Sequence, residues 1–210
     1  MNKTSRRRFL TTVGGVSAVA IAGCLDSGRP DGNAPESLSQ PVYGEKTENK
    51  PVLKLFEDYG CPACADFEEN VLPQLISDYV EPDTLYIEFY DFPIPVRQLS
   101  KPAGVSGRVV QDLSEEQVTF WDYKRQVFAN QNNLGYELFR TTANDLGLDG
   151  DEVVKQTRSG EWNKFVEQNK QYGQEIGVSG TPGLFINDTQ IDYGNYSSIT
   201  TQIELELRNQ

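Results

Sequence analysis

Two cysteines three positions apart, Cys61 and Cys64, most constrain what this chain can fold into. An apolar run over residues 51–56 precedes them and a helical pattern follows, so the pair lies where a strand gives way to a helix. The N-terminus of a helix has unpaired N–H groups and the positive end of the helix dipole, and both stabilise a thiolate at the first cysteine. The pair therefore indicates disulfide exchange with other proteins.

Zinc sites use the same cysteine spacing, but a structural zinc ion needs about four nitrogen or sulfur ligands. The chain has three cysteines and no histidine, and the N-terminus gives Cys24 another role. The lack of histidine also excludes Ser-His-Asp and Cys-His hydrolysis and most transition-metal chemistry. We therefore expect no metal and no other cofactor. A static structural disulfide stays open as an alternative to redox exchange.

The N-terminus has the features of an export signal. Three arginines at residues 6–8 precede an apolar stretch over residues 9–22, which is shorter than the roughly twenty residues of a membrane span. The arginines resemble a twin-arginine signal, and Ile-Ala-Gly-Cys at residues 21–24 resembles a lipoprotein box. We expect residues 1–23 to be removed and Cys24 to be lipidated, with an ordinary thiol as the alternative.

The composition is strongly acidic. The chain has 19 basic and 31 acidic residues, a formal net charge of −12. Removal of the signal takes four basic residues, which leaves 15 basic against 31 acidic residues and a net charge of −16. Such a surface repels phosphates, so we expect no nucleic-acid partner. It stays hydrated in concentrated salt, and with the export signal it resembles exported lipoproteins of halophilic archaea.

Residues 24–40 are rich in Gly, Pro, Ser and Asp and have no periodic apolar face, which predicts a flexible tether. The rest of the chain suits one α/β domain. We expect strands over residues 52–59 and 84–90, helices from about residue 98 to residue 176, and a hairpin over residues 184–192 that turns at Asp188-Thr189. We also expect Pro73 to kink the helix after the cysteines and Ser197 to cap the last helix. Five aromatic residues of the helical region are expected to be core residues: Phe120, Trp121, Tyr123, Phe128 and Phe139.

Three segments resemble the markers of DsbA-like thioredoxin-fold proteins, which are exported thiol–disulfide oxidoreductases. Their most specific parts are Cys-Pro-Ala-Cys, Asp91-Phe92-Pro93, and a Gly-Val-Ser-Gly-Thr-Pro run about 120 residues after the cysteines. The likeness covers about residues 41–208. It implies a thioredoxin fold with an inserted helical domain, in which residues 41–95 and 177–210 form the fold and residues 96–176 form the insertion.

The resemblance also implies roles for single residues. Cys61 attacks and Cys64 resolves the mixed disulfide. Pro182 follows a cis bond and faces the disulfide, and Thr181 offers backbone groups to an extended peptide. Gly180 gives the chain freedom to approach this turn. A plain turn before a strand is the alternative for Thr181-Pro182.

Two positions depart from the family pattern. Ala63 stands where oxidising members often carry histidine, so the Cys61 thiolate relies more on the helix terminus. Leu55 stands where many relatives place a buried carboxylate that handles the proton of the resolving thiol. Glu57 and Asp58 are candidates to replace it, but we expect both to be solvated acids at a strand end.

The first hypothesis for function is therefore a disulfide donor for exported protein thiols, held by a lipid on the extracytoplasmic face of the membrane. A membrane redox partner would restore its disulfide. One alternative is an extracytoplasmic disulfide reductase, which needs a membrane electron donor. The other is a non-enzymatic surface lipoprotein that binds partners and has a structural disulfide.

Overall fold

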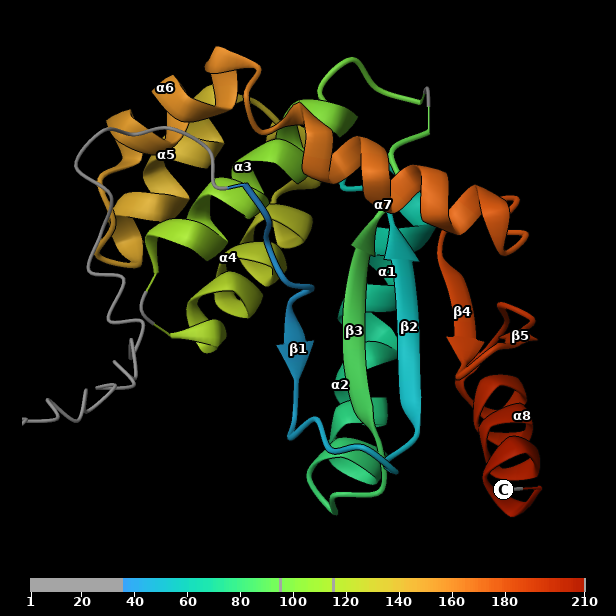
Figure 1. The fold of residues 1–210 in the computed structure, drawn as a ribbon. Coiled ribbons are helices and arrows are strands. Elements are labelled where there is room, and N and C mark those ends of the chain that lie inside the picture. The colour runs from blue at the N-terminus through green and yellow to red at the C-terminus, as the bar shows by residue number, and fades with distance from the viewer. Residues whose placement is uncertain (1–35, 95, 115, 210) are drawn as a thin grey trace, which may run out of the picture.

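The computed structural model describes residues 36–94, 96–114 and 116–209. The expectations for the signal and for Cys24 lie outside these residues. Five strands form one mixed sheet in the order β1-β3-β2-β4-β5 (Figure 1). The strands are β1 (Val42–Tyr43), β2 (Val52–Glu57), β3 (Tyr86–Asp91), β4 (Gly183–Ile186) and β5 (Thr189–Ile191).

The central strands β2 and β3 run parallel, and the other pairs are antiparallel. This pairing confirms the two expected main strands and the expected hairpin. The hairpin turns at Asn187-Asp188, one residue earlier than predicted, and Asn187 has φ +51° there. The two-residue strand β1 was not predicted, because so short an element has no detectable period.

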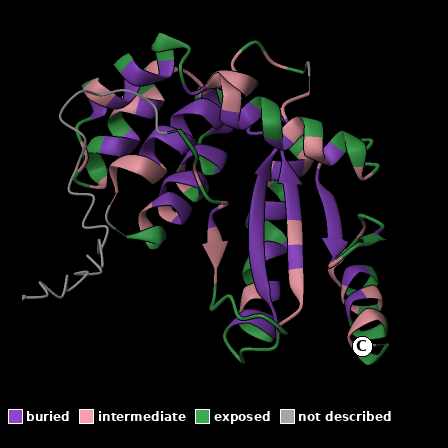
Figure 2. Ribbon diagram, in the orientation of Figure 1, coloured by how far each residue is buried: buried purple, intermediate pink, exposed green. Residues whose placement is uncertain are grey.

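The sheet is covered on both faces, and Figure 2 shows β3 and β4 buried throughout. Leu53 and Leu55 of β2 point into the main core, whereas Phe56 joins a smaller aromatic cluster on the other face. Helix α7 (Asn163–Glu175) packs on this second face. A Cβ at Gly173 would lie 2.8 Å from the Phe92 ring and 3.0 Å from the Phe56 ring, so only glycine permits this close approach.

The helix after the cysteines is interrupted, as Pro73 predicted. It consists of α1 (Pro62–Asn70), α2 (Leu72–Leu75) and the π-helix η1 (Ile76–Val80). Pro73 lies in the first turn of α2, where its missing N–H is tolerated. The predicted apolar stripe is buried along all three segments: Phe67, Val71, Leu75 and Tyr79.

The region between β3 and β4 is helical, as expected. It consists of α3 (Ser100–Leu113), α4 (Gln117–Ala129), the 3-10 turn η2 (Gln131–Asn133), α5 (Tyr136–Asp145), α6 (Gly150–Ser159) and α7. The five aromatic side chains predicted to form its core are buried. The final helix α8 (Tyr196–Arg208) is capped by Asn195, whose side chain accepts a hydrogen bond from the Ser198 N–H. The cap predicted at Ser197 was therefore wrong by two residues.

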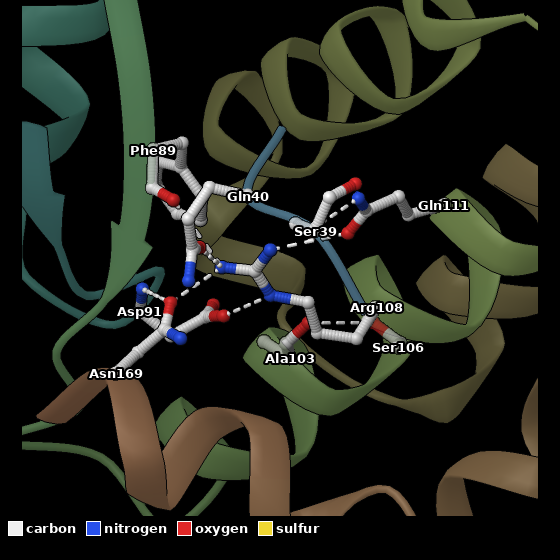
Figure 3. Close-up of polar contacts among 9 residues, drawn as sticks. All are labelled: Ser39, Gln40, Phe89, Asp91, Ala103, Ser106, Arg108, Gln111 and Asn169. Carbon is white, nitrogen blue, oxygen red and sulfur yellow. Dashed lines mark hydrogen bonds and ion pairs between the residues drawn. The ribbon is translucent and has the colours of Figure 1, made fainter. Parts of the chain in front are cut away.

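A buried arginine joins the helical insertion to the sheet (Figure 3). Arg108 of α3 donates from Nε to Asp91 at the end of β3, over 2.5 Å, and from a terminal nitrogen to Asn169 of α7, over 2.7 Å. It also donates to the side chain of Gln40. Because Arg108 and Asp91 are both almost fully buried, each charge depends on the other for compensation.

Candidate active site

The two cysteines lie at the junction of β2 and α1, where the sequence placed them. Cys61 is the N-cap of α1 with extended backbone angles (φ −83°, ψ 121°), and Pro62 takes the first helical position. The Cys61 carbonyl accepts hydrogen bonds from the N–H groups of Cys64 and Ala65, over 3.1 and 3.2 Å. Both cysteines are free thiols and both are buried, Cys64 completely. The Cys61 sulfur thus lies at the positive end of α1.

The surroundings separate the pKa values of the two thiols. A hydrogen bond from the Cys64 thiol, with further ones from Thr181 and from the N–H groups of Cys64 and Ala63, outweighs burial and lowers the pKa of Cys61 to about 5. Burial, the hydrogen bond to Cys61 and the charge of Glu57 raise the pKa of Cys64. At neutral pH these shifts favour a thiolate at Cys61 and a protonated thiol at Cys64, a difference that suits Cys61 for nucleophilic attack.

The loop before β4 lies against Cys61. The Thr181–Pro182 bond is cis, as the resemblance implied, and the Cys61 Sγ lies 3.5 Å from the Thr181 carbonyl oxygen. Gly183 pairs with Phe56 of β2, which brings this loop beside the cysteine loop. A cleft of about 260 Å³ opens here between residues 179–183 and residues 190–193. The cleft thus adjoins Cys61 through Thr181, which lines it and whose carbonyl contacts the sulfur.

Gly180 contributes to this cleft, but nothing in its surroundings requires glycine. Its φ is not in the left-handed region, and a Cβ there would meet no atom within 4 Å. The conformational reason expected for Gly180 was therefore wrong. Ala63, between the cysteines, is half-buried, and its carbonyl lies 3.5 Å from the Tyr193 hydroxyl.

The acids at the end of β2 are not solvated, which corrects the prediction from the sequence. Glu57 and Asp58 are each 1% exposed. Asp58 accepts hydrogen bonds from the N–H groups of Gly60 and Ile94, over 2.7 and 2.9 Å, so it holds the cysteine loop against the segment after β3. Burial is the main reason that the pKa of Asp58 is raised.

Glu57 belongs to a buried charge cluster that the sequence did not reveal. Its Oε2 lies 2.7 Å from the Lys124 Nζ of α4, and Lys124 also pairs with Glu68 of α1. The lysine is fully buried. Its ammonium lies 4.7 to 5.2 Å from the centres of three rings, those of Phe89, Trp121 and Phe128.

One acidic group of the cluster, Glu57, also influences Cys64. Burial and the nearby Glu68 raise the pKa of Glu57 well above its ordinary value, against the opposing effect of Lys124. Burial lowers the pKa of Lys124, but the two carboxylates outweigh it and raise the value overall. The charge of Glu57 contributes to the raised pKa of Cys64, so this carboxyl acts electrostatically on that thiol.

One signal in the sequence pointed to Glu57. Side chains alternate along a strand, so Glu57 shares a face with the apolar Leu53 and Leu55, which the structure buries in the main core. No comparable signal marked Lys124, which follows Glu57 by 67 positions in an amphipathic helix.

Within the part of the chain that the structure describes, no helix is long and apolar enough to cross a bilayer. The same residues contain no group of three or more acidic or cysteine side chains arranged to hold a metal ion. The expected lipidation site, Cys24, lies outside these residues, whereas Gln40 and Ser39 at the end of the expected tether bind side chains of α3.

Comparison with known proteins gives concordant matches. The family model described as thioredoxin matches residues 36–205. The disulfide bond formation protein D of Bacillus subtilis is 24% identical over 182 residues, which cover 83% of this chain and 80% of that protein. Two solved structures have a similar fold. The oxidised form of BdbD from Bacillus subtilis has a TM-score of 0.73, with 23% identity over 80% of this chain and 93% of that one. DsbA from Chlamydia trachomatis has a TM-score of 0.72, with 16% identity over 84% and 95% of the two chains. The expected fold class, a thioredoxin fold with an inserted helical domain, is confirmed.

Proposed function

Because this chain belongs to the thioredoxin family, we propose that it is a DsbA-like protein disulfide oxidoreductase whose redox pair is Cys61 and Cys64. The observation that carries the proposal is the position of Cys61. Its sulfur lies at the N-terminus of α1 and 3.5 Å from the carbonyl of the cis-proline loop. A stabilised thiolate beside a cleft for another chain is the arrangement that disulfide exchange needs.

The exchange proceeds in two displacements. A substrate thiolate attacks the Cys61 sulfur of the oxidised pair, a mixed disulfide forms, and Cys64 leaves. A second substrate thiolate then attacks the substrate sulfur of the mixed disulfide, and Cys61 leaves as a stable thiolate. The substrate gains a disulfide and the pair gains two electrons. A membrane redox partner must accept those electrons before the next cycle.

Glu57 supplies the proton in the first displacement. The raised pKa of Glu57 favours the protonated carboxyl, and the raised pKa of Cys64 makes the departing sulfur a strong base. Proton transfer from Glu57 to Cys64 therefore avoids a buried, unpaired thiolate. In this role Glu57 replaces the buried carboxylate that many relatives have at the position of Leu55.

The cis-proline loop holds the substrate. Thr181 and Gly180 border the cleft beside Cys61, and extended backbone next to β4 can pair with a substrate strand. Pro182 is buried in this loop and has no N–H, so it adds no unpaired donor near the sulfur.

The direction we favour is oxidation of the substrate. A thiolate that is stable in the reduced enzyme makes the disulfide a stronger oxidant. Reference couples run from about −270 mV at a thiol pKa near 7 to about −120 mV at a pKa near 3.5. A Cys61 pKa lowered to about 5 lies between these two thiol pKa values and so favours an oxidising couple. The acidic cluster beside Cys64 opposes this trend and is the feature that favours the alternative, a reductase.

The chain acts outside the cytoplasm in this proposal. The N-terminal signal directs export, a lipid on Cys24 anchors the chain, and residues 24–40 tether the body to a membrane in a salt-rich habitat. Cys24→Ser tests the anchor, because it removes the acceptor for the lipid and leaves the body intact. The variant should move from the membrane fraction to the soluble fraction with full exchange activity. Retention in the membrane would contradict a lipid anchor at Cys24.

Variants of the two cysteines test the enzyme proposal. Cys61→Ser should abolish exchange with a reduced, unfolded model protein, whereas Cys64→Ser should accumulate mixed disulfides through Cys61. Equilibration with glutathione buffers then gives the potential and hence the direction. A Cys61–Cys64 disulfide that resists dithiols, together with unmodified thiols at mildly acidic pH, would favour a structural disulfide in a non-enzymatic binding protein.

A further inference from the structure

A glutamine from the helical insertion binds the backbone of the nucleophilic cysteine. Gln131 opens the turn η2 after α4, and its side chain is buried. Its Nε2 donates one hydrogen bond to the Cys61 carbonyl, over 2.8 Å, and another to the Tyr59 carbonyl, over 2.9 Å. Both amide hydrogens of Gln131 are thus directed at the loop that carries the nucleophile.

Two further contacts hold the groups on either side of these hydrogen bonds. Arg97, in the segment between β3 and α3, donates to the Gln131 carbonyl over 3.0 Å. Phe128, one turn earlier in α4, stacks on the Tyr59 ring with a centroid distance of 4.6 Å and an interplanar angle of 18°. The backbone of Gln131 and the ring of Tyr59 are therefore both held by residues other than the ones that these hydrogen bonds join.

The Cys61 carbonyl is the acceptor that matters most for reactivity. It carries a partial negative charge on the same residue as the sulfur, and it also accepts from the N–H groups of Cys64 and Ala65. Each donor offsets part of that negative charge and so favours a thiolate on Cys61. Without Gln131 the Cys61 carbonyl would keep two of its three donors, the N–H groups of Cys64 and Ala65, and the Tyr59 carbonyl in the same loop would lose its hydrogen bond from Gln131.

We propose that Gln131 is a positioning residue for disulfide exchange, which holds the Cys61 carbonyl and thereby stabilises the Cys61 thiolate from the helical insertion. This inference rests on the proposed function of the cysteine pair. It gives the insertion a part in the chemistry, because a side chain of η2 reaches the reacting residue through its backbone.

Gln131→Met is the test, because methionine has a similar length and no donor. We expect the acid dissociation constant of the Cys61 thiol to fall about threefold, which is the effect of losing one modest hydrogen bond. Thiolate absorbance measured against pH gives this constant. The equilibrium constant with glutathione should move about threefold toward the disulfide of the enzyme, which corresponds to about 14 mV in the reducing direction. Gln131→Glu adds a negative charge and should move both quantities further, by about tenfold.

Asn132→Ala is the matched control, since Asn132 is exposed and lies next in the same turn. It should leave the titration and the equilibrium constant unchanged. Gln131→Asn serves as a second variant if the methionine variant does not fold, and its shorter amide should shift both quantities in the same direction.

A folded Gln131→Met or Gln131→Asn protein would overturn the inference if its Cys61 titration and its equilibrium constant with glutathione equalled those of the wild type, even if its midpoint of urea unfolding had changed. If the proposed function itself were wrong, the result would be different. The wild-type protein itself would then fail to exchange disulfides with the model substrate.

Discussion

The buried charge cluster gives the sharpest test of how this site is held together, through the substitution Lys124→Met. Methionine fills a similar volume among the three aromatic rings but leaves Glu57 and Glu68 without their cation. The side chains of Lys124 and Glu57 are fully buried, and that of Glu68 is 6% exposed. Removal of one member of such a group leaves a buried charge without compensation.

The expected loss follows from that burial. Breaking a buried ion pair costs about 3–5 kcal/mol, and a share of this is recovered when a carboxyl takes up a proton instead of remaining charged. We therefore expect the free energy of unfolding to fall by about 3 kcal/mol near neutral pH. For a domain of this size that corresponds to a decrease in Tm of about 6–12 °C.

The loss should depend on pH in a defined direction. The pKa of Glu57 is raised in the folded protein, so the folded state binds a proton that the unfolded state releases. The associated stability is fully present below the unfolded pKa, about 4.5, and is lost as the pH rises through the folded value. Lys124→Met removes the cation that lowers the pKa of Glu57 in the folded protein, so the pH range over which stability is lost extends to higher pH. The variant should thus be closer to the wild type at about pH 5 than at about pH 8.

Urea unfolding at both pH values measures these differences. Lys101→Met is the control, because Lys101 pairs with Glu167 at the surface and its loss should cost no more than about 0.5 kcal/mol. Addition of Glu57→Gln and Glu68→Gln to Lys124→Met removes the uncompensated charges and should restore at least half of the loss. A loss below about 1 kcal/mol in Lys124→Met, or one equal at both pH values, would refute the argument.

One titration of the unchanged protein and two substitutions further test the site and the core. The rate of Cys61 alkylation against pH should have its half-point near 5, whereas a half-point near that of a free thiol, about 8.5, would mean that the site does not stabilise the thiolate. Ala63→His should make the couple more oxidising by about 30 mV, through an imidazolium near the thiolate, and an unchanged potential would show that position 63 does not act on the sulfur. Gly173→Ala should lower the free energy of unfolding by about 1–3 kcal/mol, because its Cβ would lie 2.8 Å from the Phe92 ring, and an unaffected urea midpoint would contradict this tight packing.

The sequence predicted the centre of the site because its signals are local. A strand, a Cys-Pro start and an apolar stripe lie within one stretch, and each reflects a backbone preference of the residues involved. The Thr181-Pro182 step came from the family pattern. Periodicity could not have placed it beside Cys61, since the two are 120 positions apart.

The charged partners were beyond sequence reasoning for a different reason. The chain has 31 acidic and 19 basic residues, so any acid has many candidate partners and composition does not choose among them. Lys124 and Arg108 lie on amphipathic helices, where a solvated face is the ordinary expectation for a cation. Only the packing of α3 and α4 against the sheet turns these two cations inward.

Glu57 shows how two sequence signals can conflict. Its place at the end of a strand favoured a solvated acid, while its alternation with Leu53 and Leu55 favoured the core. The second signal prevailed, because a lysine from α4 compensates the carboxyl after it leaves water. Whether an acidic side chain is buried thus depends on the charged partner that another element supplies.

The insertion and the sheet are therefore dependent on each other through buried polar groups. Asp91 needs Arg108, Glu57 needs Lys124, and the Cys61 carbonyl accepts from Gln131, and in each pair the second residue belongs to the insertion. Leaving a buried partner unpaired costs more than the contact itself contributes. A relative's insertion grafted onto this sheet would thus disrupt both stability and the redox pair, unless the graft also restored these three donors.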